Sequence, residues 1–375
     1  MSDLTKLRDE IDEIDKEIVR LFERRMDISR SVAEYKISTG KHVLDKGREH
    51  YKLKLLKSQT SNSFYAHGVE ELFTQIMSMS RKLQYGLLAE RGLIGVPDFE
   101  IVDELYKNNV TVAYQGIPGS YGEEAMRNYF PGDITAVNVN TFNDAMCALR
   151  DKKVRYAVLP LENSTAGIVS DVYDLLVEFD NYIVDIYELR LDQNLLAVPG
   201  ATLDDIRTVY SHPQGLMQSS KFLDEHDWER ITMENTAVSA RHVANMADKS
   251  RAAIGSVNAA KNYGLCVLQP KINHNDHNFT RFVIISRYKM CRRDAGKILV
   301  SFETPHESGS LYNMLSHFIY NDLNMTRIES RPIPGHKWEF RFYVEFEGAI
   351  DDPGVVNALG GIRDEAQNLK VLGNY

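Results

Sequence analysis

Several features are scarce or absent in this sequence. Its three cysteines, Cys147, Cys266 and Cys291, are far apart and lack the CxxC spacing of a zinc site. This predicts a reducing compartment with neither disulfides nor bound metal. No apolar run approaches the roughly 20 residues of a membrane span. The first residues are acidic and amphipathic, without the regions of a signal peptide, so we predict a cytoplasmic protein with no membrane partner.

Charge of one sign is not concentrated anywhere in the chain. The net charge is −9, and neither Lys nor Arg forms a block, which disfavours a nucleic-acid partner. This pattern is compatible with a small anionic substrate that is bound by a few individual Lys or Arg side chains. The chain also lacks a Gly-x-Gly-x-x-Gly fingerprint and a Walker sequence, so we expect no nucleotide cofactor, and no other cofactor is indicated.

The length predicts more than one domain. At 375 residues the chain exceeds the usual 100–200 residues per domain, and its 43% hydrophobic and 26% charged content is typical of globular proteins. We predict an all-α domain over residues 1–90, a linker over 91–108, an α/β domain over 109–287 and an α+β domain over 296–375.

The first segment predicts one long amphipathic helix. Neither Pro nor Gly occurs between Leu4 and Lys36, and apolar residues follow a three-four spacing through more than four heptads. Such a helix needs a partner for its apolar seam. Arg25 stands where an apolar residue is due. A buried charge costs several kcal/mol unless it is paired, so Arg25 either meets a carboxylate or lies at a solvated helix end.

Two further helices are predicted, from about Asp45 to Lys57 and from about Phe64 to Leu88, with Gly40 ending the first. In the third helix, polar residues continue an apolar i, i+4 column, which contains Leu72, Ile76, Ser80 and Gln84. Taken alone, a polar helix end explains Ser80 and Gln84. The complete polar array of the three helices consists of Arg8, Arg25, Lys36, Asp45, Arg48, Glu49, Ser80 and Gln84.

This array resembles that of the all-helical chorismate mutases, which are interlocked dimers of three-helix chains, over about residues 1–90. The resemblance implies that Arg25 and Arg8 hold the two carboxylates of chorismate. It assigns Lys36 and Gln84 to the breaking ether oxygen and Glu49, with the Asp45 region, to the ring hydroxyl. Arg48 and Ser80 complete the site. Arg8 and Lys36 are 28 residues apart, about 42 Å along a helix, so Arg8 must come from a second copy.

The central segment repeats one unit, in which a short apolar strand stops at a polar turn and a helix begins. The predicted strands are Val110–Tyr114, Tyr156–Leu159, Thr208–Tyr210 and Ala252–Ile254. Ser120 is predicted to cap the first of these helices, with Glu123 three residues later. Helix N-termini offer unpaired amides and a positive dipole end, which suit an anion.

A further strand follows at Asn278–Phe282, which runs into Val283–Ser286. Thr280 and Arg281 lie between two phenylalanines, which we expect to exclude water from whatever these residues contact. An ordinary strand with an exposed Thr and Arg is the alternative. The four strand–turn–helix units that precede this strand favour a binding site at Thr280 and Arg281.

Four motifs, Gly116–Tyr121, Glu162–Thr165, Ser211–Gln214 and Asn278–Phe282, stand in the order found in prephenate dehydratases, which residues 109–287 resemble. The resemblance implies two lobes, as in periplasmic binding proteins, with the site between them. It implies that Thr280 donates to the leaving hydroxyl, polarised by Glu162 or Arg281. The substrate-binding residues implied are Ser120, Tyr121, Asn163, Ser164, Thr165, Ser211, Gln214, Arg281 and Phe282. For His212 we favour a structural hydrogen bond over an acid role.

From Lys297 the chain reads as a ferredoxin-like β-α-β-β-α-β unit. Gly309–Tyr312 and Glu329–Pro332 resemble the phenylalanine-contacting motifs of ACT regulatory domains, with Ser310 departing from the usual Gly-Ala-Leu. The resemblance implies an effector site built from Gly309, Ser310, Leu311, Glu329 and Ser330. A folding or dimerisation unit without a ligand is the alternative.

Together these resemblances predict an enzyme that converts chorismate to prephenate and prephenate to phenylpyruvate, under feedback by L-phenylalanine, as a homodimer or tetramer. Two alternatives remain open at this point. One is a small-molecule sensor without turnover, and the other is a dehydratase with an inactive mutase domain. The sequence leaves arogenate open as a second substrate.

Overall fold

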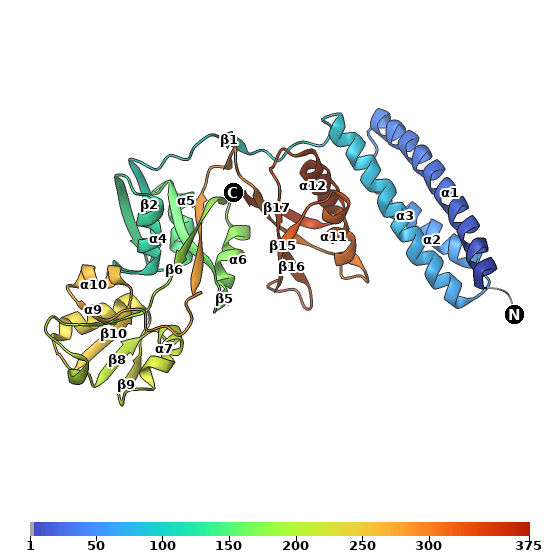
Figure 1. Cartoon of the computed structure of the whole chain (residues 1–375). Helices are drawn as coiled ribbons and strands as arrows, with labels where there is room; N and C mark the ends of the chain where they lie inside the picture. The colour runs from blue at the N-terminus through green and yellow to red at the C-terminus, as the bar shows by residue number, and fades with distance from the viewer. Residues whose placement is uncertain (1–3) are drawn as a thin grey trace. The chain divides into compact units, whose positions relative to one another are not determined.

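The computed structural model describes residues 4–375, which form two compact units (Figure 1). The first unit contains the described residues up to Asp98 together with Gly296–Val371, and the second contains Phe99–Ala295 and Leu372–Tyr375. The helical and C-terminal segments, which are far apart in sequence, therefore share one unit. Within residues 4–375, no helix combines the length and apolar character needed to cross a membrane.

Three helices begin the first unit, close to the limits predicted from the sequence. They are α1 (Leu4–Thr39), α2 (Lys46–Ser58) and α3 (Ser63–Glu90). Gly40 ends α1 with a φ of 65°, a conformation that glycine adopts readily. Asp45 caps α2, because its Oδ1 accepts a hydrogen bond of 3.0 Å from the backbone nitrogen of Arg48. Both α1 and α2 pack against α3.

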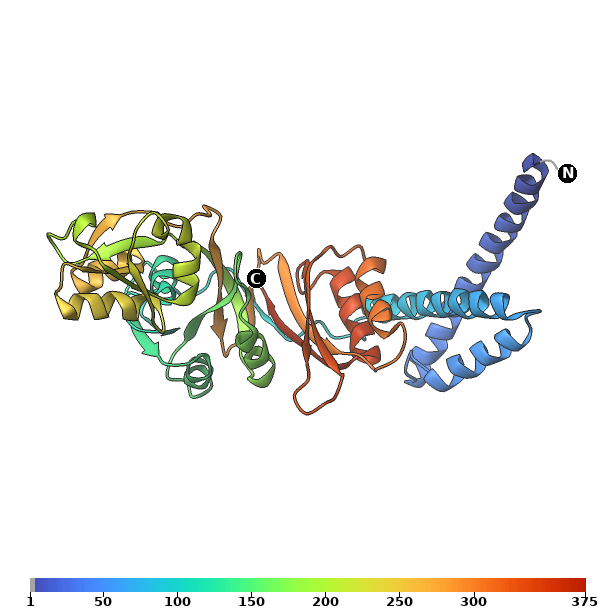
Figure 2. The same cartoon turned by 90° about the horizontal axis from the view of Figure 1, so that it is seen from below.

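The seam of α1 is largely uncovered. Ile11, Ile14 and Ile18 are each more than half exposed, and the buried residues of α1 are Ser29 and Ala33, near its C-terminal end. In Figure 2 the N-terminal half of α1 extends beyond α2 and α3. Such a row of apolar side chains is stable in water when a second surface covers it.

The C-terminal part of the first unit has the element order that the sequence predicted. Its elements are β14 (Lys297–Glu303), α11 (Ser310–Tyr320), β15 (Met325–Pro332), β16 (Phe340–Glu347), α12 (Pro353–Glu365) and β17 (Gln367–Asn374). The strand order is β15-β16-β14-β17, α11 and α12 pack together, and α3 packs on α12. Trp338, two residues before β16 begins, has a φ of 64° and is not part of a strand.

One lobe of the second unit is a sheet with the strand order β6-β12-β4-β2-β3. These strands are β2 (Val110–Gln115), β3 (Ile134–Val139), β4 (Tyr156–Asn163), β6 (Tyr182–Arg190) and β12 (Phe279–Ser286). The helices of this lobe are α4 (Tyr121–Tyr129), α5 (Phe142–Arg150) and α6 (Ser170–Glu178). The region assigned to a linker contains β1 (Glu100–Val102), which pairs with β13 (Met290–Arg292). The short β5 (Gly167–Ile168) pairs with β4.

The other lobe has the strand order β11-β7-β10-β8-β9. Its strands are β7 (Asn194–Ala197), β8 (Thr208–Ser211), β9 (Glu229–Thr232), β10 (Arg251–Gly255) and β11 (Cys266–Gln269). Its helices are α7 (Pro213–Gln218), α8 (Ser220–Leu223), α9 (Thr236–Met246), α10 (Val257–Tyr263) and a 3-10 turn at Leu203–Asp205. Residues 191–193 and 270–278 connect the lobes, each of which has its own apolar core. The predicted two-lobed α/β arrangement is thus present.

Three of the four predicted strand–turn–helix units are confirmed, with Ser120, His212 and Ser256 as the N-cap residues. The second unit is wrong. Instead of stopping at Leu159, β4 continues to Asn163, and the next helix begins only at Ser170. The reason is tertiary, because β12 pairs along the whole of β4. A bulge at Leu161, next to Pro160, interrupts the register where the proline has no amide proton to donate.

Candidate active sites

A cavity of about 250 Å³ lies among the three N-terminal helices. Its lining includes seven of the eight polar residues that the sequence singled out, namely Arg25, Lys36, Asp45, Arg48, Glu49, Ser80 and Gln84. Arg8 is exposed on α1 and is not among the described residues that line this cavity. One chain therefore supplies most of the array but not all of it.

Arg25 is half-buried and meets neutral groups. Its Nη1 donates to Ile76 O at 3.3 Å and to Ser80 Oγ. No carboxylate in residues 4–375 forms an ion pair with it, so the expected carboxylate partner is wrong, while the neighbouring seam residues Leu21 and Ile28 are more than half exposed. Burial lowers the pKa of Arg25, and the charge of Glu49 partly offsets this. A cation held by neutral partners has its charge available for an anion in the cavity.

Lys36 and Gln84 come from different helices. The Nζ of Lys36 donates to Val43 O at 2.6 Å, and burial lowers the pKa of Lys36. Gln84 is only 6% exposed, which excludes a solvated helix end. Its Nε2 donates to Ser80 O at 3.1 Å, while its Oε1 is buried and accepts no hydrogen bond from the described residues. A half-turn of this amide exchanges the two atoms and presents a donor.

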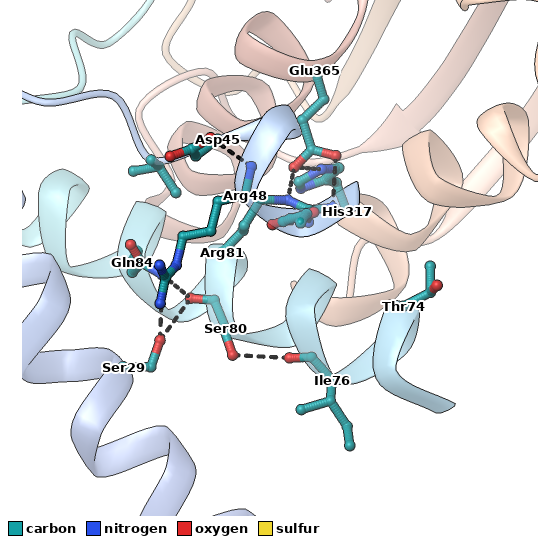
Figure 3. A network of polar contacts seen from close by, with 12 residues as sticks. Ser29, Asp45, Arg48, Thr74, Ile76, Ser80, Arg81, Gln84, His317 and Glu365 are labelled. Atoms are coloured by element: carbon teal, nitrogen blue, oxygen red, sulfur yellow. Dashed lines mark hydrogen bonds and ion pairs between the residues drawn. The ribbon is translucent and has the colours of Figure 1, made fainter. Parts of the chain in front are cut away.

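Arg81 is a lining residue that sequence reasoning missed. Its guanidinium lies between Glu49 of α2 and Glu365 of α12, and it is 6% exposed (Figure 3). The distances are 2.6 Å from Nη1 to Glu49 Oε2 and 2.7 Å from Nε to Glu365 Oε1. No local pattern signals this residue, because Glu365 lies 284 positions away in the sequence.

A second polar cluster surrounds Thr280 in the second unit. Thr280 is 5% exposed and lies opposite Asn163 in the register of β12 and β4. Asn163 Nδ2 donates to Thr280 Oγ1 at 2.9 Å, while Asn163 Oδ1 accepts from Thr165 Oγ1 at 2.7 Å. Because the Thr280 oxygen accepts from Asn163, its own proton is directed elsewhere and is available to a ligand.

Helix α7 of the other lobe adds two glutamines to this cluster. Gln218 Nε2 donates to Thr165 Oγ1 at 2.8 Å, and Gln218 Oε1 accepts from Asn278 Nδ2 at 3.1 Å. These hydrogen bonds join the lobes. Gln214 lies one turn earlier on the same helix face, and its buried Nε2 has no hydrogen-bond partner among the described residues. Sequence reasoning missed Gln218, although its i, i+4 spacing from Gln214 was a usable signal.

Several residues assigned to substrate binding already hold the fold together. Ser120 caps α4, Tyr121 OH donates to Asp192 O at 3.0 Å, and Ser211 Oγ donates to Ile254 O at 3.3 Å. The hydroxyl of Ser164 donates to His277 O at 2.7 Å. Burial lowers the pKa of His212, whose Nδ1 accepts from Gln214 N, which agrees with the structural role favoured for it.

The side chains proposed to polarise Thr280 are otherwise engaged. Glu162 and Arg281 lie 3.3 Å apart in an ion pair, and the pleat of the strands places them on the face opposite to Thr280. In the structure Asn163 contacts the Thr280 hydroxyl in their place. The expected aromatic shield is incomplete as well. Phe282 is buried, whereas Phe279 is 38% exposed at the edge of the strand.

Another cavity, of about 200 Å³, lies at the start of α11. Gly309, Ser310 and Leu311 line it, together with residues 338–340 of the segment before and within β16. Gly309 has a φ of 80°, which turns the chain into the helix. Glu329 and Ser330 lie on β15 and are not among the described lining residues, so the two predicted effector motifs do not share this cavity.

The helical pocket with its cations and the two-lobed unit with its hydroxyl and amide cluster together define a multidomain enzyme for small carboxylate-bearing substrates. Residues 7–85 match the family model "Chorismate mutase type II", and residues 112–290 match "Prephenate dehydratase". The bifunctional chorismate mutase/prephenate dehydratase of Enterobacter agglomerans is 30% identical over 99% of this chain and 95% of that protein. The chain belongs to the bifunctional chorismate mutase/prephenate dehydratase family and carries both activities of phenylalanine biosynthesis.

Solved structures resemble about 70% of the chain. The prephenate dehydratase of Arthrobacter aurescens in complex with L-Phe is 28% identical, with a TM-score of 0.66, over 71% of this chain and 89% of that one. GqqA, described as a novel type of quorum quenching acylase, is 31% identical, with a TM-score of 0.64, over 70% of this chain and 96% of that one.

Proposed function

We propose that the helical cavity is the chorismate site, and that Arg8 of the partner subunit completes it in a homodimer. The observation that carries this proposal is the convergence of seven predicted residues on one cavity, which the eighth cannot reach. Along α1, Arg8 lies 28 residues, or about 42 Å, from Lys36. A second copy of the chain would also cover the exposed seam of α1, as the fold of a long amphipathic helix requires.

The chemistry explains why this site needs cations and amides rather than an acid or base. Chorismate rearranges within one molecule, so the protein has to hold a compact conformer and stabilise negative charge growing on the ether oxygen. Arg25 and Arg8 of the partner subunit hold the two carboxylates. Lys36 and Gln84 donate to the ether oxygen, and Glu49 accepts from the ring hydroxyl.

Subunit complementation tests the origin of Arg8. Arg8→Ala and Arg25→Ala chains each lose mutase activity, because every site in either homodimer lacks one arginine. In a mixed dimer one site lacks both arginines and the other is intact, so a random equimolar mixture regains about one quarter of the wild-type mutase rate. The measurement is mutase activity after the two proteins are unfolded together and refolded. A mixture as inactive as its components places Arg8 elsewhere.

The pH dependence of the mutase tests Gln84. An amide donates at any pH, so wild-type activity varies little between about pH 6 and 8. In Gln84→Glu the buried carboxyl has a raised pKa, donates only when protonated, and repels the growing charge when ionised. We expect its mutase kcat/KM to fall by about 10²-fold from pH 5 to pH 8. A steep acidic optimum in the wild type would contradict this assignment.

For the dehydratase we propose Thr280 as the donor to the leaving ring hydroxyl, held by Asn163. Gln214 supplies an unpaired amide for the pyruvyl carboxylate. Loss of CO2 and water makes an aromatic ring, so the enzyme has to assist the hydroxyl without stabilising the departing carboxylate. The ion pair between Arg281 and Glu162 supports this. Arg281 is the cation of the Asn278–Phe282 motif, and its pairing with Glu162 leaves less positive charge to stabilise the departing carboxylate of prephenate before it reacts.

We further propose that the C-terminal β-α-β-β-α-β unit is an ACT domain that binds L-phenylalanine at the cavity lined by Gly309–Leu311. The amides of a helix start suit the effector carboxylate, and the related Arthrobacter aurescens enzyme is described with L-Phe bound. The test measures chorismate and prephenate turnover separately, with and without phenylalanine. Ultraviolet absorbance should show phenylpyruvate formed from each substrate and less of it with phenylalanine. Intact substrates would indicate a sensor, and turnover of prephenate alone an idle mutase domain.

A further inference from the structure

One guanidinium connects the mutase cavity to the C-terminal part of the same unit. Arg81 Nη1 donates to both oxygens of Glu49, at 2.8 and 2.6 Å. The opposite edge of the guanidinium faces α12, where Nε and Nη2 donate to the two oxygens of Glu365 at 2.7 and 3.2 Å. Figure 3 shows Arg81 reaching Glu365 beside His317, with Ser80 and Gln84 of the cavity on the same helix.

The contact with Glu365 fixes the plane of the guanidinium. Two parallel N–H···O bonds to one carboxylate define both position and orientation, which a single contact does not. Burial alone would raise the pKa of Glu365, but contacts with His317 and Arg81 outweigh it and hold the pKa at about 2. Glu365 is therefore charged at neutral pH. The partner on the other side, Glu49, lines the cavity together with Asp45.

The surroundings of Glu365 leave little room for movement. His317 Nε2 of α11 lies 3.3 Å from Glu365 Oε1. Gly361 of α12 brings the helices close together, since a Cβ there would lie 2.3 Å from the ring of His317 and 3.2 Å from that of Tyr85. Tight packing of this kind transmits a displacement at one side chain to its neighbours.

We infer that Arg81 is a positioning residue of the mutase reaction, which acts through Glu49 and is itself held by Glu365 of the C-terminal domain. This inference rests on the function proposed for Glu49, the acceptor of the ring hydroxyl. The C-terminal domain thereby supplies one contact on which the geometry of the mutase site depends. Glu365 is not among the described residues that line the cavity, so its effect on the mutase passes through the guanidinium.

A purely structural role for the junction is the competing explanation, and the neighbouring contact provides its control. Lys82 Nζ donates to Ser316 Oγ of α11 at 2.8 Å across the same junction. Lys82 is not among the described residues that line the cavity. Lys82→Met removes a buried charge at the junction and leaves the Glu49–Arg81–Glu365 contacts in place.

The test uses the full chain with Glu365→Gln, which keeps the size of the side chain and removes its charge. We expect the mutase kcat/KM to fall about tenfold while prephenate turnover stays at the wild-type rate. Lys82→Met should change mutase kcat/KM by less than about twofold. In a Glu49→Gln background, Glu365→Gln should cause no further loss, because the group through which it acts is already changed.

Arg81→Lys provides a second variant if Glu365→Gln does not fold. Lysine keeps the charge but cannot bridge two carboxylates bidentately, so we expect a similar mutase loss. The inference is overturned if Glu365→Gln causes the same fold loss with and without Glu49→Gln, if Lys82→Met matches Glu365→Gln, or if Arg81→Lys retains full mutase activity. Wild-type mutase activity in Glu49→Gln alone would instead refute the proposed role of Glu49.

Discussion

Arg25→Ala is expected to lower mutase kcat/KM by at least about 10³-fold and to leave prephenate turnover unchanged. The Arg25 guanidinium is half-buried on Ser80 Oγ and Ile76 O, and no carboxylate of residues 4–375 pairs with it. Alanine therefore removes a preorganised positive charge whose counterion is the substrate. The dehydratase cluster lies in the other compact unit and contains none of these groups.

Arg30→Ala is the matched control for this prediction. Arg30 is an exposed arginine of the same helix, five residues further on, and does not line the cavity among the described residues. Its loss removes one charge and changes helix propensity by the same small amount. The measurement is the mutase rate and the dehydratase rate of each variant, determined separately. Equal loss of both activities in Arg25→Ala would indicate a folding defect and contradict the assigned role.

Thr280→Val is expected to lower dehydratase kcat by about 10²–10³-fold, with the mutase rate unchanged. Valine is close in size to threonine and favours strands, so β12 should keep its pairing. The substitution removes the hydroxyl proton that is free for a ligand, and it leaves Asn163 Nδ2 without one of its acceptors. The measurement is phenylpyruvate formation from prephenate, with mutase turnover as the internal reference.

Thr208→Val controls for the loss of a buried threonine hydroxyl in a strand of the same unit. Thr208 lies on β8, is 8% exposed, and its hydroxyl contacts Glu229 Oε2 at 3.4 Å. We expect its dehydratase rate to stay within about twofold of the wild type. Should Thr280→Val retain more than about a tenth of wild-type kcat while Thr208→Val behaves normally, a residue other than Thr280 assists the leaving hydroxyl.

Local patterns in the sequence predicted the helices and caps well. A three-four apolar spacing ended by Gly40 gave α1, and small hydroxyl residues marked the starts of α4 and α10. These features depend on neighbours within a few positions, so they can be read from the chain itself. The resemblance to the chorismate mutases singled out eight polar residues, and seven of them line one cavity in the structure.

Where distant segments meet, the sequence predicted less. The strand β4 continues through Pro160 because β12, more than a hundred residues later, pairs with it. Glu162 was expected beside Thr280, yet the pairing register places it on the opposite face with Arg281. Gln218 reaches Thr165 and Asn278 only because α7 of one lobe lies against the other.

The sequence by itself determined the class of each segment, because spacing, charge and helix length are local quantities. Tertiary structure alone decided which polar groups remain available to a ligand. It paired Glu162 with Arg281, made the Thr280 oxygen an acceptor for Asn163, and placed Glu365 against Arg81 beside the helical cavity. These outcomes depend on contacts between residues that are more than a hundred positions apart in the sequence, and no local pattern encodes such contacts.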